Sequence, residues 1–274
     1  MSTDPITSTQ NTLIKHAAAL RDRRDRRREG LILIDGCREL TRAIEAGVEI
    51  IRVFAPRDTS TDARDEEALE RSRQHGAEVH HAAPGAFRKI AYGQRDSGLV
   101  AVARRPGREL STLTTGHPAL IAIAERIEKP GNLGAIIRSA DGAALDAVIA
   151  VDSATDLYGP NVIRASLGTV FTVQVFETSV PQMTAWLDGQ SMQLVAAVPD
   201  GETSYTDVDF RLPSAILFGA EAHGVSGAWL QTPMIRASVP MIGRADSLNV
   251  AATAAVFFYE ALRQRNTRGP RRSV

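Results

Sequence analysis

The sequence contains a single cysteine, Cys37, so the chain cannot form an internal disulfide bond or a zinc site built from several cysteines. This usage is typical of a reducing compartment, and we expect the protein in the cytoplasm. No run reaches the roughly 18 consecutive apolar residues that a membrane-spanning helix needs. The opening residues, MSTDPITSTQ, lack the apolar core of a secretory signal. The sequence therefore predicts neither a membrane span nor export.

Net charge is also lacking, because 32 basic residues balance 32 acidic ones. The charge is nevertheless uneven along the chain. Residues 1–30 carry seven basic residues against four acidic ones, and residues 260–274 carry five arginines against one acid. Basic ends can contact phosphate groups. Lysine is rare and arginine replaces it throughout the chain, so the basic ends alone do not establish a nucleic-acid partner.

The 43% of hydrophobic residues suffices for a buried core, and the first hundred residues predict a small layered domain. A polar helix with alternating charge is expected over residues 12–29. Apolar runs that alternate with helical patterns then predict a βαβαβ order closed by one more strand. The expected strands are 31–36, 49–56, 77–82 and 98–103, and the expected helices between them are 37–47 and 62–76.

A second α/β alternation follows a stretch rich in Pro, Gly, Ser and Thr over residues 104–118. Its short apolar runs predict buried parallel strands in an open α/β sheet. We expect strands at 119–126, 147–152, 193–198, 215–219 and 237–241, and helices at 133–144 and 250–265. The predicted organisation is an N-terminal domain at 1–107, a linker at 108–117 and a second domain at 118–274.

Three segments that follow strands of the second sheet carry unusual polar residues. They read EKPGNLGAIIRSADG, FGAEAHGVS and PMIGRADSLNVAATAA. Each polar residue has an ordinary structural explanation, since Asn132 can cap a helix and Ser247 can cap the last one. Ligands of open α/β sheets, however, bind beyond the carboxyl ends of the strands, where all three segments lie. Their coincidence at one edge predicts a binding site.

Several familiar signatures are missing. The turn after the first strand of the second domain reads PGNLGA, which lacks the G-x-G-x-x-G of dinucleotide-binding folds. The sequence also has no G-x-x-x-x-G-K-[ST] and no G-x-S-x-G. His80 and His81 are adjacent in a predicted strand and point to opposite faces, so they do not form a joint metal site. We expect no metal.

Taken together, the motifs GNLGAIIRSA, ILFGAEAHGVS and VPMIGRADSLNVAATAA resemble those of the SpoU (TrmH-like) family of SPOUT RNA 2′-O-methyltransferases, in the same order. The match covers about residues 117–265. The preceding segment REGLILIDGCRELTRAIEAGVEIIRVF resembles the substrate-binding domain of the two-domain rRNA enzymes of this family, which include antibiotic-resistance methyltransferases. The resemblance spans nearly the whole chain.

The resemblance implies an α/β fold in which a knotted (trefoil) SPOUT methyltransferase domain follows a smaller N-terminal α/β RNA-binding domain. It also implies a homodimer that transfers a methyl group from S-adenosylmethionine to the ribose of RNA. Small residues in the cofactor loops would let the main chain approach the purine. The implied cofactor-binding residues are Phe218, Gly219, Glu221, Gly224, Val239, Met241, Ile242, Ser247, Leu248, Asn249 and Ala251.

The catalytic residues that the resemblance implies are Asn132, Arg138, Glu221, Ser247 and Asn249. In the family the arginine that matches Arg138 is proposed to assist deprotonation of the ribose hydroxyl. Arginine is protonated at ordinary pH, so orienting a phosphate is the less demanding role, and both roles stay open. Arg164, Ser166 and Gly168 resemble a further family segment near the active site.

Substrate choice is expected from the N-terminal domain, through phosphate contacts and RNA shape. Large-subunit (23S) ribosomal RNA is favoured because the auxiliary domain is present. Transfer RNA and a catalytically silent RNA-binding protein of the same fold are the alternatives, and a housekeeping role is not separated from antibiotic resistance. The RNA-binding candidates, chosen by charge, are Arg23, Arg24, Arg27, Arg38, Arg88 and Arg95.

Overall fold

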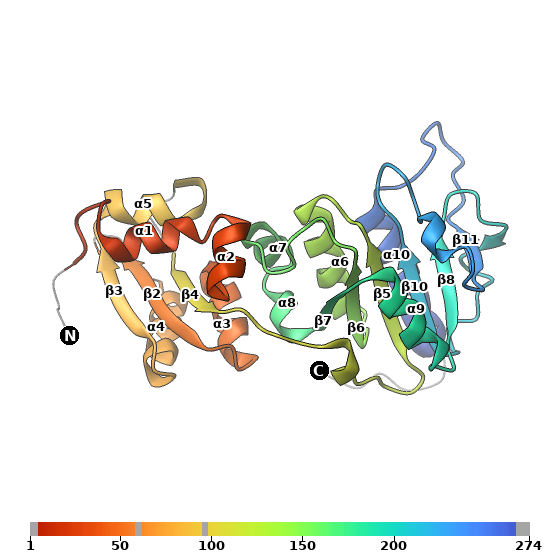
Figure 1. Ribbon diagram of the computed structural model, residues 1–274, viewed down its shortest axis with the longest axis horizontal. Coiled ribbons are helices and arrows are strands. Elements are labelled where there is room, and N and C mark those ends of the chain that lie inside the picture. The colour runs from red at the N-terminus through yellow and green to blue at the C-terminus, as the bar shows by residue number, and fades with distance from the viewer. Residues whose placement is uncertain (1–4, 58–61, 95–97, 267–274) are drawn as a thin grey trace. The chain divides into compact units, whose positions relative to one another are not determined.

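The computed structural model describes residues 5–57, 62–94 and 98–266, and the chain divides into two compact units (Figure 1). The first unit comprises residues 1–107 together with Tyr158–Thr172. The second comprises Arg108–Leu157 and Val173–Val274. Its contacts therefore group the segment Tyr158–Thr172 with residues that come more than fifty positions earlier in the sequence. Among the described residues, no helix is long and apolar enough to cross a membrane.

The first unit is built on a four-stranded sheet in the order β1-β4-β2-β3. The last strand inserts between the first two and runs antiparallel to both, whereas β2 and β3 are parallel. The predicted βαβαβ order is thus present in sequence, but β1 and β2 are not neighbours. The strands are β1 (Leu31–Asp35), β2 (Ile50–Pro56), β3 (Glu78–Ala82) and β4 (Val100–Arg104).

Helices cover this sheet, and the single helix predicted over residues 12–29 is wrong, because two helices occupy that stretch. Asp22 caps the second helix by accepting a hydrogen bond from the Arg24 amide at 2.7 Å. The buried Arg26 donates to the carbonyl of Leu20 at 2.9 Å and so holds the break. The α-helices are α1 (Thr12–Ala19), α2 (Arg23–Glu29), α3 (Cys37–Glu45), α4 (Ala63–Gln74), α5 (Pro84–Ile90), α7 (Pro160–Ala165) and α8 (Thr169–Thr172), with a 3₁₀ turn η1 (Tyr92–Gln94).

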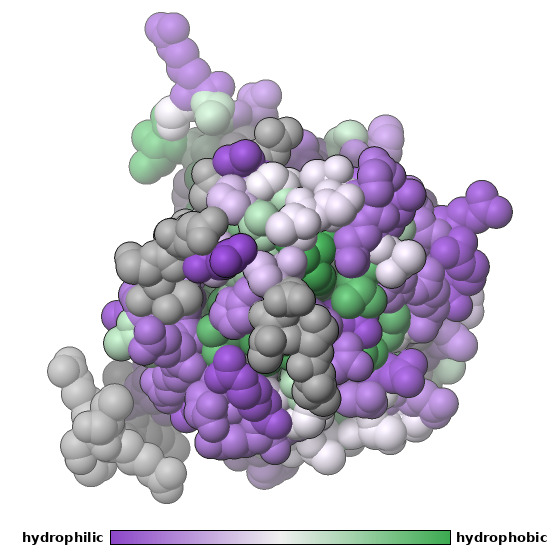
Figure 2. Space-filling view, turned by 90° about the vertical axis from the view of Figure 1, so that its left-hand side faces the viewer, coloured by the Kyte–Doolittle hydropathy of each residue, from purple (hydrophilic) through white to green (hydrophobic). Residues whose placement is uncertain are grey.

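Close contacts hold α7 and α8 in the first unit. Arg42 on α3 donates a hydrogen bond to the carbonyl of Leu167 at 2.6 Å. Gly168 has a φ of +84° and lies so close to α3 that an added Cβ would be 2.9 Å from the Cα of Glu39. Only glycine fits this approach without a shift of the backbone. On the face shown in Figure 2, hydrophilic side chains predominate around a small hydrophobic area.

The second unit contains a seven-stranded sheet in the order β7-β6-β5-β10-β8-β11-β9, and every neighbouring pair is parallel. The central strands are buried along their whole length, which explains their continuous apolar sequences. The strands are β5 (Leu120–Glu125), β6 (Ala147–Val151), β7 (Gln174–Thr178), β8 (Gln193–Ala197), β9 (Thr203–Ser204), β10 (Ser214–Phe218) and β11 (Ile235–Ser238). The predicted open α/β sheet is confirmed.

The predicted strand at 237–241 is wrong in its bounds, because β11 ends at Ser238. Pro240 has no N–H to give to the ladder, so residues from Val239 onward form a loop. The long helix α10 follows this loop and packs against α6 (Figure 1). Its Phe257 and Phe258 rings contact the Phe218 ring edge-on. The remaining helices are α6 (Pro130–Gly142), α9 (Val180–Asp188) and α10 (Val250–Asn266), with 3₁₀ turns η2 (Leu110–Thr112) and η3 (Gly227–Trp229).

Candidate active site

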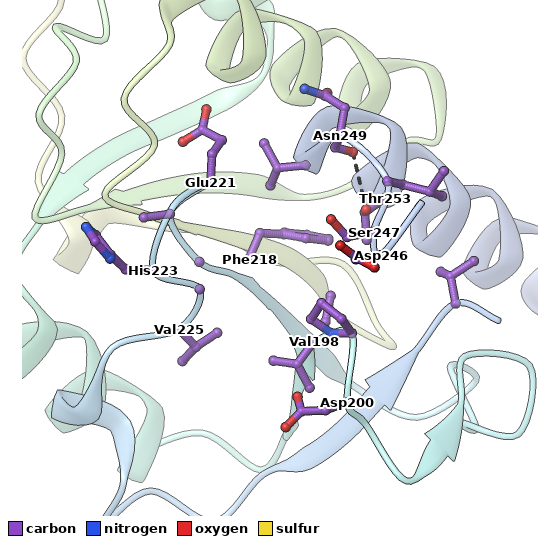
Figure 3. A pocket seen from close by; sticks show the side chains of 18 of the residues that line it. Val198, Asp200, Phe218, Glu221, His223, Val225, Asp246, Ser247, Asn249 and Thr253 are labelled. Atoms are coloured by element: carbon purple, nitrogen blue, oxygen red, sulfur yellow. Dashed lines mark hydrogen bonds between the residues drawn. The ribbon is translucent and has the colours of Figure 1, made fainter. Parts of the chain in front are cut away.

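A cavity of about 650 Å³ opens in the second unit where β8, β10 and β11 end. Its walls come from the loops that follow these strands, from Lys129 after β5 and from the start of α10. Figure 3 shows Phe218 near the middle, with Asp246 and Ser247 on one side and Val198 and Asp200 on another. The volume lies in the range of small-molecule sites. Parallel strands thus bring segments distant in sequence to one site, as their carboxyl ends predict.

The loop after β10 folds back on itself. The amide of Ala220 donates a hydrogen bond to the carbonyl of Gly224 at 3.0 Å, and the amide of Gly224 donates one to the carbonyl of Ala220 at 2.8 Å. An added Cβ at Gly219 would be 2.1 Å from the carbonyl carbon of Gly224. Glycine is required at 219 by the loop itself, which is a different reason from the expected close approach of a ligand.

A buried carboxylate ties this loop to the neighbouring strand. Glu125, the last residue of β5, is fully buried and accepts a hydrogen bond from the Ser226 amide at 3.0 Å. It also accepts one from the Ser226 hydroxyl. Both bonds satisfy carboxyl oxygens that would otherwise be costly to bury. Glu125 therefore fixes the far end of the loop that starts at Gly219.

Side chains from all three motifs form one chain of hydrogen bonds beside the cavity. The Asn132 amide nitrogen donates to Glu221 Oε1 at 2.6 Å. The Asn249 amide nitrogen donates to Asn132 Oδ1 at 3.2 Å, and Asn249 Oδ1 accepts from the Ala251 amide at 3.0 Å. We call these three side chains the Asn132–Glu221–Asn249 network. The three motifs are far apart in sequence, and the fold brings them together.

The network holds Glu221 as an anion. Burial by itself would raise the pKa of this carboxyl group, but the hydrogen bonds that it accepts outweigh burial and lower the pKa below its ordinary value. They come from Asn132 and from backbone amides, including those of Glu128 and Lys129 at the start of α6. A helix N-terminus favours a negative charge. Glu221 is thus a fixed negative group near the cavity.

Most of the predicted cofactor-binding residues line the cavity. Ile242 does not, since its side chain is 98% exposed, and Ala251 contributes its backbone amide to the cap of α10 and is absent from the lining. The predicted residues that line it are Phe218, Gly219, Glu221, Gly224, Val239, Met241, Ser247, Leu248 and Asn249.

The structure differs from the prediction at two of the catalytic residues. Asn132 is not the N-cap of α6, because the helix starts two residues earlier at Pro130, and its side chain is instead free to reach Glu221. Arg138 is exposed on α6, does not line the cavity and contacts no hydrogen-bond or ionic partner in the described part of the chain. The structure brings Asn132, Glu221 and Asn249 together and leaves Arg138 outside this network.

The sequence reasoning missed several charged residues of the cavity. Asp200 follows β8 and pairs with Arg236, which donates to both carboxylate oxygens at 2.8 and 2.7 Å. Asp246 and Lys129 also line the cavity. The signal for Asp200 was available, because it follows an apolar strand at the same edge as the three motifs.

The predicted RNA-binding arginines lie in the first unit, except for Arg95, which is outside the described residues. Arg24 and Arg27 are exposed on α2, and Arg38 pairs with Glu39 at 3.2 Å. Arg23 and Arg88 lie on α2 and α5. The segment with Arg164, Ser166 and Gly168 also belongs to the first unit, and none of the three lines the cavity. Within the described ranges, no group of three or more His, Cys, Asp or Glu residues is arranged to hold a metal ion.

A parallel α/β unit with a nucleotide-sized cavity at its carboxyl edge, preceded by a separate α/β unit, defines a two-domain ligand-binding or enzyme fold. Comparison with known families specifies it further. The model described as the SpoU rRNA Methylase family matches residues 119–259, and the one described as the MRM3-like substrate binding domain matches residues 11–101. The chain belongs to the SpoU rRNA methylase family.

Individual relatives are similar to this chain over nearly its whole length. The 23S rRNA (uridine(2479)-2′-O)-methyltransferase of Streptomyces viridochromogenes is 31% identical over 271 residues, covering 95% of this chain and 92% of the relative. A crystal structure of an RNA 2′-O ribose methyltransferase is 37% identical, with a TM-score of 0.84, and covers 96% of this chain and 99% of its own. The SpoU methyltransferase AviRb from S. viridochromogenes, in complex with AdoMet, has a TM-score of 0.86 at 29% identity and covers 94% and 99%. The predicted family and its α/β fold are confirmed.

Proposed function

We propose that this protein transfers the methyl group of S-adenosylmethionine to a ribose 2′-hydroxyl of large-subunit (23S) ribosomal RNA. The observation that carries the proposal is the Asn132–Glu221–Asn249 network, which assembles all three motifs at the rim of a nucleotide-sized cavity. The Streptomyces relative is named for this reaction on 23S rRNA. A catalytically silent protein would not need to keep a polar network at an open cavity.

The cavity suits S-adenosylmethionine, which combines an apolar purine with a charged amino-acid end. Its walls are apolar at Val198, Val239 and Met241, where a purine fits. Carboxylates at Asp200 and Asp246 suit hydroxyl and ammonium groups. When bound, the cofactor supplies a methyl group activated by a positive sulfur. Phe218, Gly219, Glu221, Gly224, Met241, Ser247, Leu248 and Asn249 complete the proposed binding set.

The residues of the network would act by positioning. Glu221 is held as an anion, and Asn132 and Asn249 fix its side chain and the start of α10. Positioning of two reactants is a large source of rate enhancement in such a transfer. Ser247 lines the same wall and offers a hydroxyl to either reactant. Arg138, exposed on α6, would orient the RNA phosphate near the reacting hydroxyl.

The first unit would bind the RNA substrate. Its arginines Arg24 and Arg27 are exposed on one short helix, and its visible face is mostly hydrophilic (Figure 2). Phosphate contacts of this kind place an RNA without reading its sequence. The proposed organisation is an RNA-binding domain at 1–107, a linker at 108–117 and the methyltransferase domain from 118 onward.

We further propose that the second unit is a trefoil knot and that the protein works as a cytoplasmic homodimer. The central position of β10 between β5 and β8, with α10 returning to pack on α6, is compatible with a threaded chain. Ile242 at 98% and Tyr259 at 52% are exposed apolar residues that a second copy would cover. Sedimentation equilibrium tests the dimer, and a monomer at micromolar concentration would reject it.

The decisive experiment incubates purified protein with labelled S-adenosylmethionine and either unmodified 23S rRNA or unmodified tRNA, and then maps ribose methylation. We expect label on 23S rRNA only. Label on tRNA would favour the transfer-RNA alternative, and label on a base would reject the 2′-O assignment. Calorimetry supplies the cofactor test, with Gly219→Ala expected to abolish binding because its Cβ meets the loop backbone. Gly85→Ala, whose Cβ meets nothing within 4 Å, is the matched control.

A further inference from the structure

A second cavity, of about 300 Å³, lies entirely within the first unit and takes no part in the site described above. Its floor is apolar, since Leu33 on β1 and Ile90 on α5 are both buried there. Its rim includes Arg21 from the turn between α1 and α2, and Asn161 from α7. Four segments from distant parts of the sequence thus build one small pocket.

Tyr92 forms an aromatic wall of this pocket. Its side chain lines the cavity and is 48% exposed, so one part of the ring is open to solvent. The guanidinium group of Arg164 lies over the ring, 3.4 Å from its centroid. A cation on an aromatic face stabilises the ring in one orientation. The Tyr92 amide also donates to Asp35 Oδ2 at 2.5 Å, which fixes the backbone of the turn.

The polar groups of the pocket set the chemistry of its occupant. Asp35 is 4% exposed and places a carboxylate at the inner end of the cavity. A carboxylate accepts hydrogen bonds from N–H groups and repels a phosphate. Arg21 lies at the solvent side, where it uses one of its N–H groups to hold the Ala91 carbonyl. The pocket therefore has a negative inner end, an aromatic wall and a positive rim.

We propose that this pocket binds one unstacked nucleobase of the substrate RNA that carries an amino group, namely adenine, guanine or cytosine. The base stacks on the face of the Tyr92 ring that Arg164 leaves open, its amino group donates to Asp35, and its phosphate lies near Arg21. Single-stranded RNA is recognised by aromatic stacking and by contacts to base edges. The volume is at the small end for ligand sites, which suits a single base rather than a helix. This inference rests on RNA being the substrate.

The test compares Tyr92→Ala with Tyr92→Phe, which keeps the aromatic face. Binding of a 23S rRNA fragment is measured by filter retention, and S-adenosylmethionine binding by calorimetry. We expect Tyr92→Ala to weaken RNA binding about tenfold, in the range found for loss of one base stack. Tyr92→Phe retains RNA binding within twofold, and both variants bind the cofactor normally. If the Tyr92→Ala variant binds RNA with the same affinity as the wild-type protein, the proposal is overturned.

A second measurement tests the role of Asp35. Short oligo(C) and oligo(U) compete with the RNA fragment for the protein. We expect oligo(C) to compete better, because cytosine offers an amino group, whereas the ring N–H of uracil lies between two carbonyl oxygens that a carboxylate repels. The preference should disappear in Asp35→Asn. Equal competition by the two oligonucleotides in the unmodified protein overturns the amino-group requirement. Absence of both S-adenosylmethionine binding and RNA methylation would reject the proposed function. If the protein methylates RNA but replacing Tyr92 does not change RNA binding, only the role of this pocket is rejected.

Discussion

Asn132 and Glu221 are 89 residues apart in sequence, yet the Asn132 amide nitrogen lies 2.6 Å from the Glu221 carboxylate. Asn132 lies in the first turn of α6, which follows β5, and Glu221 lies in the loop that follows β10. These strands are parallel neighbours, with Ala124 opposite Phe218, so their following loops necessarily meet. The register of one strand pair thereby decides the geometry of the proposed active site.

Replacing Asn132 with alanine removes the hydrogen bond that orients Glu221 and also releases Asn249. A hydrogen bond to a charged group contributes about 1.5–3 kcal/mol when shielded, and this one is partly open to solvent. We therefore expect kcat for methyl transfer to fall about tenfold. The variant should unfold at a temperature close to that of the unmodified protein, because Asn132 is outside the core. Unchanged kcat in a labelled-methyl assay would contradict the proposed positioning role.

The depressed pKa of Glu221 predicts a specific pH dependence of stability. Because the carboxyl group has a lower pKa folded than unfolded, its ionised form stabilises the fold above its ordinary value of 4.5. This contribution is lost as the pH falls through the lower, folded pKa. The difference in unfolding free energy between the unmodified protein and Glu221→Gln should therefore shrink below pH 4.5. Urea unfolding at several pH values measures it, with the exposed Glu128→Gln as control. A difference that grows on acidification would contradict this sign.

Glu125 contributes to stability through the loop that it holds. Glu125→Ala leaves the Ser226 amide and hydroxyl without their acceptor in a partly buried site. Loss of such a partner typically costs about 1–3 kcal/mol per unsatisfied group. We expect the free energy of unfolding to fall by at least about 2 kcal/mol and cofactor affinity to fall with it. Glu128→Ala, which removes an exposed carboxylate three residues away, should change neither by a measurable amount.

Much of the second unit could be predicted, because its central strands are continuous apolar runs that stand between recognisable helices. The elements toward the edges of the sheet were harder to predict. β7 and α9 were missed, although Ser179 and Gln182 form a capping box that marks the start of α9. β11 was predicted too late along the chain because the apolar pattern of ASVPM hides the effect of Pro240.

Many of the residues that line the cavity could be predicted, but their contacts could not. Strand-end reasoning found Glu221, Ser247 and Asn249, yet the pairing of Asn132 with Glu221 depends on strand order, which no local pattern encodes. The packing of Arg164 over Tyr92 in the first unit was equally invisible, because tertiary contacts decide with which unit α7 lies.

Arg138 offers a direct test of how the proton leaves the ribose hydroxyl. It lies outside the cavity, so Arg138→Ala and Arg138→Lys should bind S-adenosylmethionine as the unmodified protein does. Both should lower kcat/KM, because alanine removes the charge and lysine removes the planar fork that holds a phosphate. We expect a loss of at least about tenfold for alanine and a smaller loss for lysine.

Salt dependence separates the two roles left open for Arg138. A phosphate contact that releases one counterion should lower the slope of log KM against log salt by about one when it is removed. A proton acceptor would leave that slope unchanged and would instead alter the pH profile of kcat. We expect the change in slope for Arg138→Ala and an unaltered profile for Arg138→Lys. Near-normal transfer by Arg138→Lys at all salt concentrations would show that neither a fork-shaped phosphate contact nor proton abstraction is needed at this position.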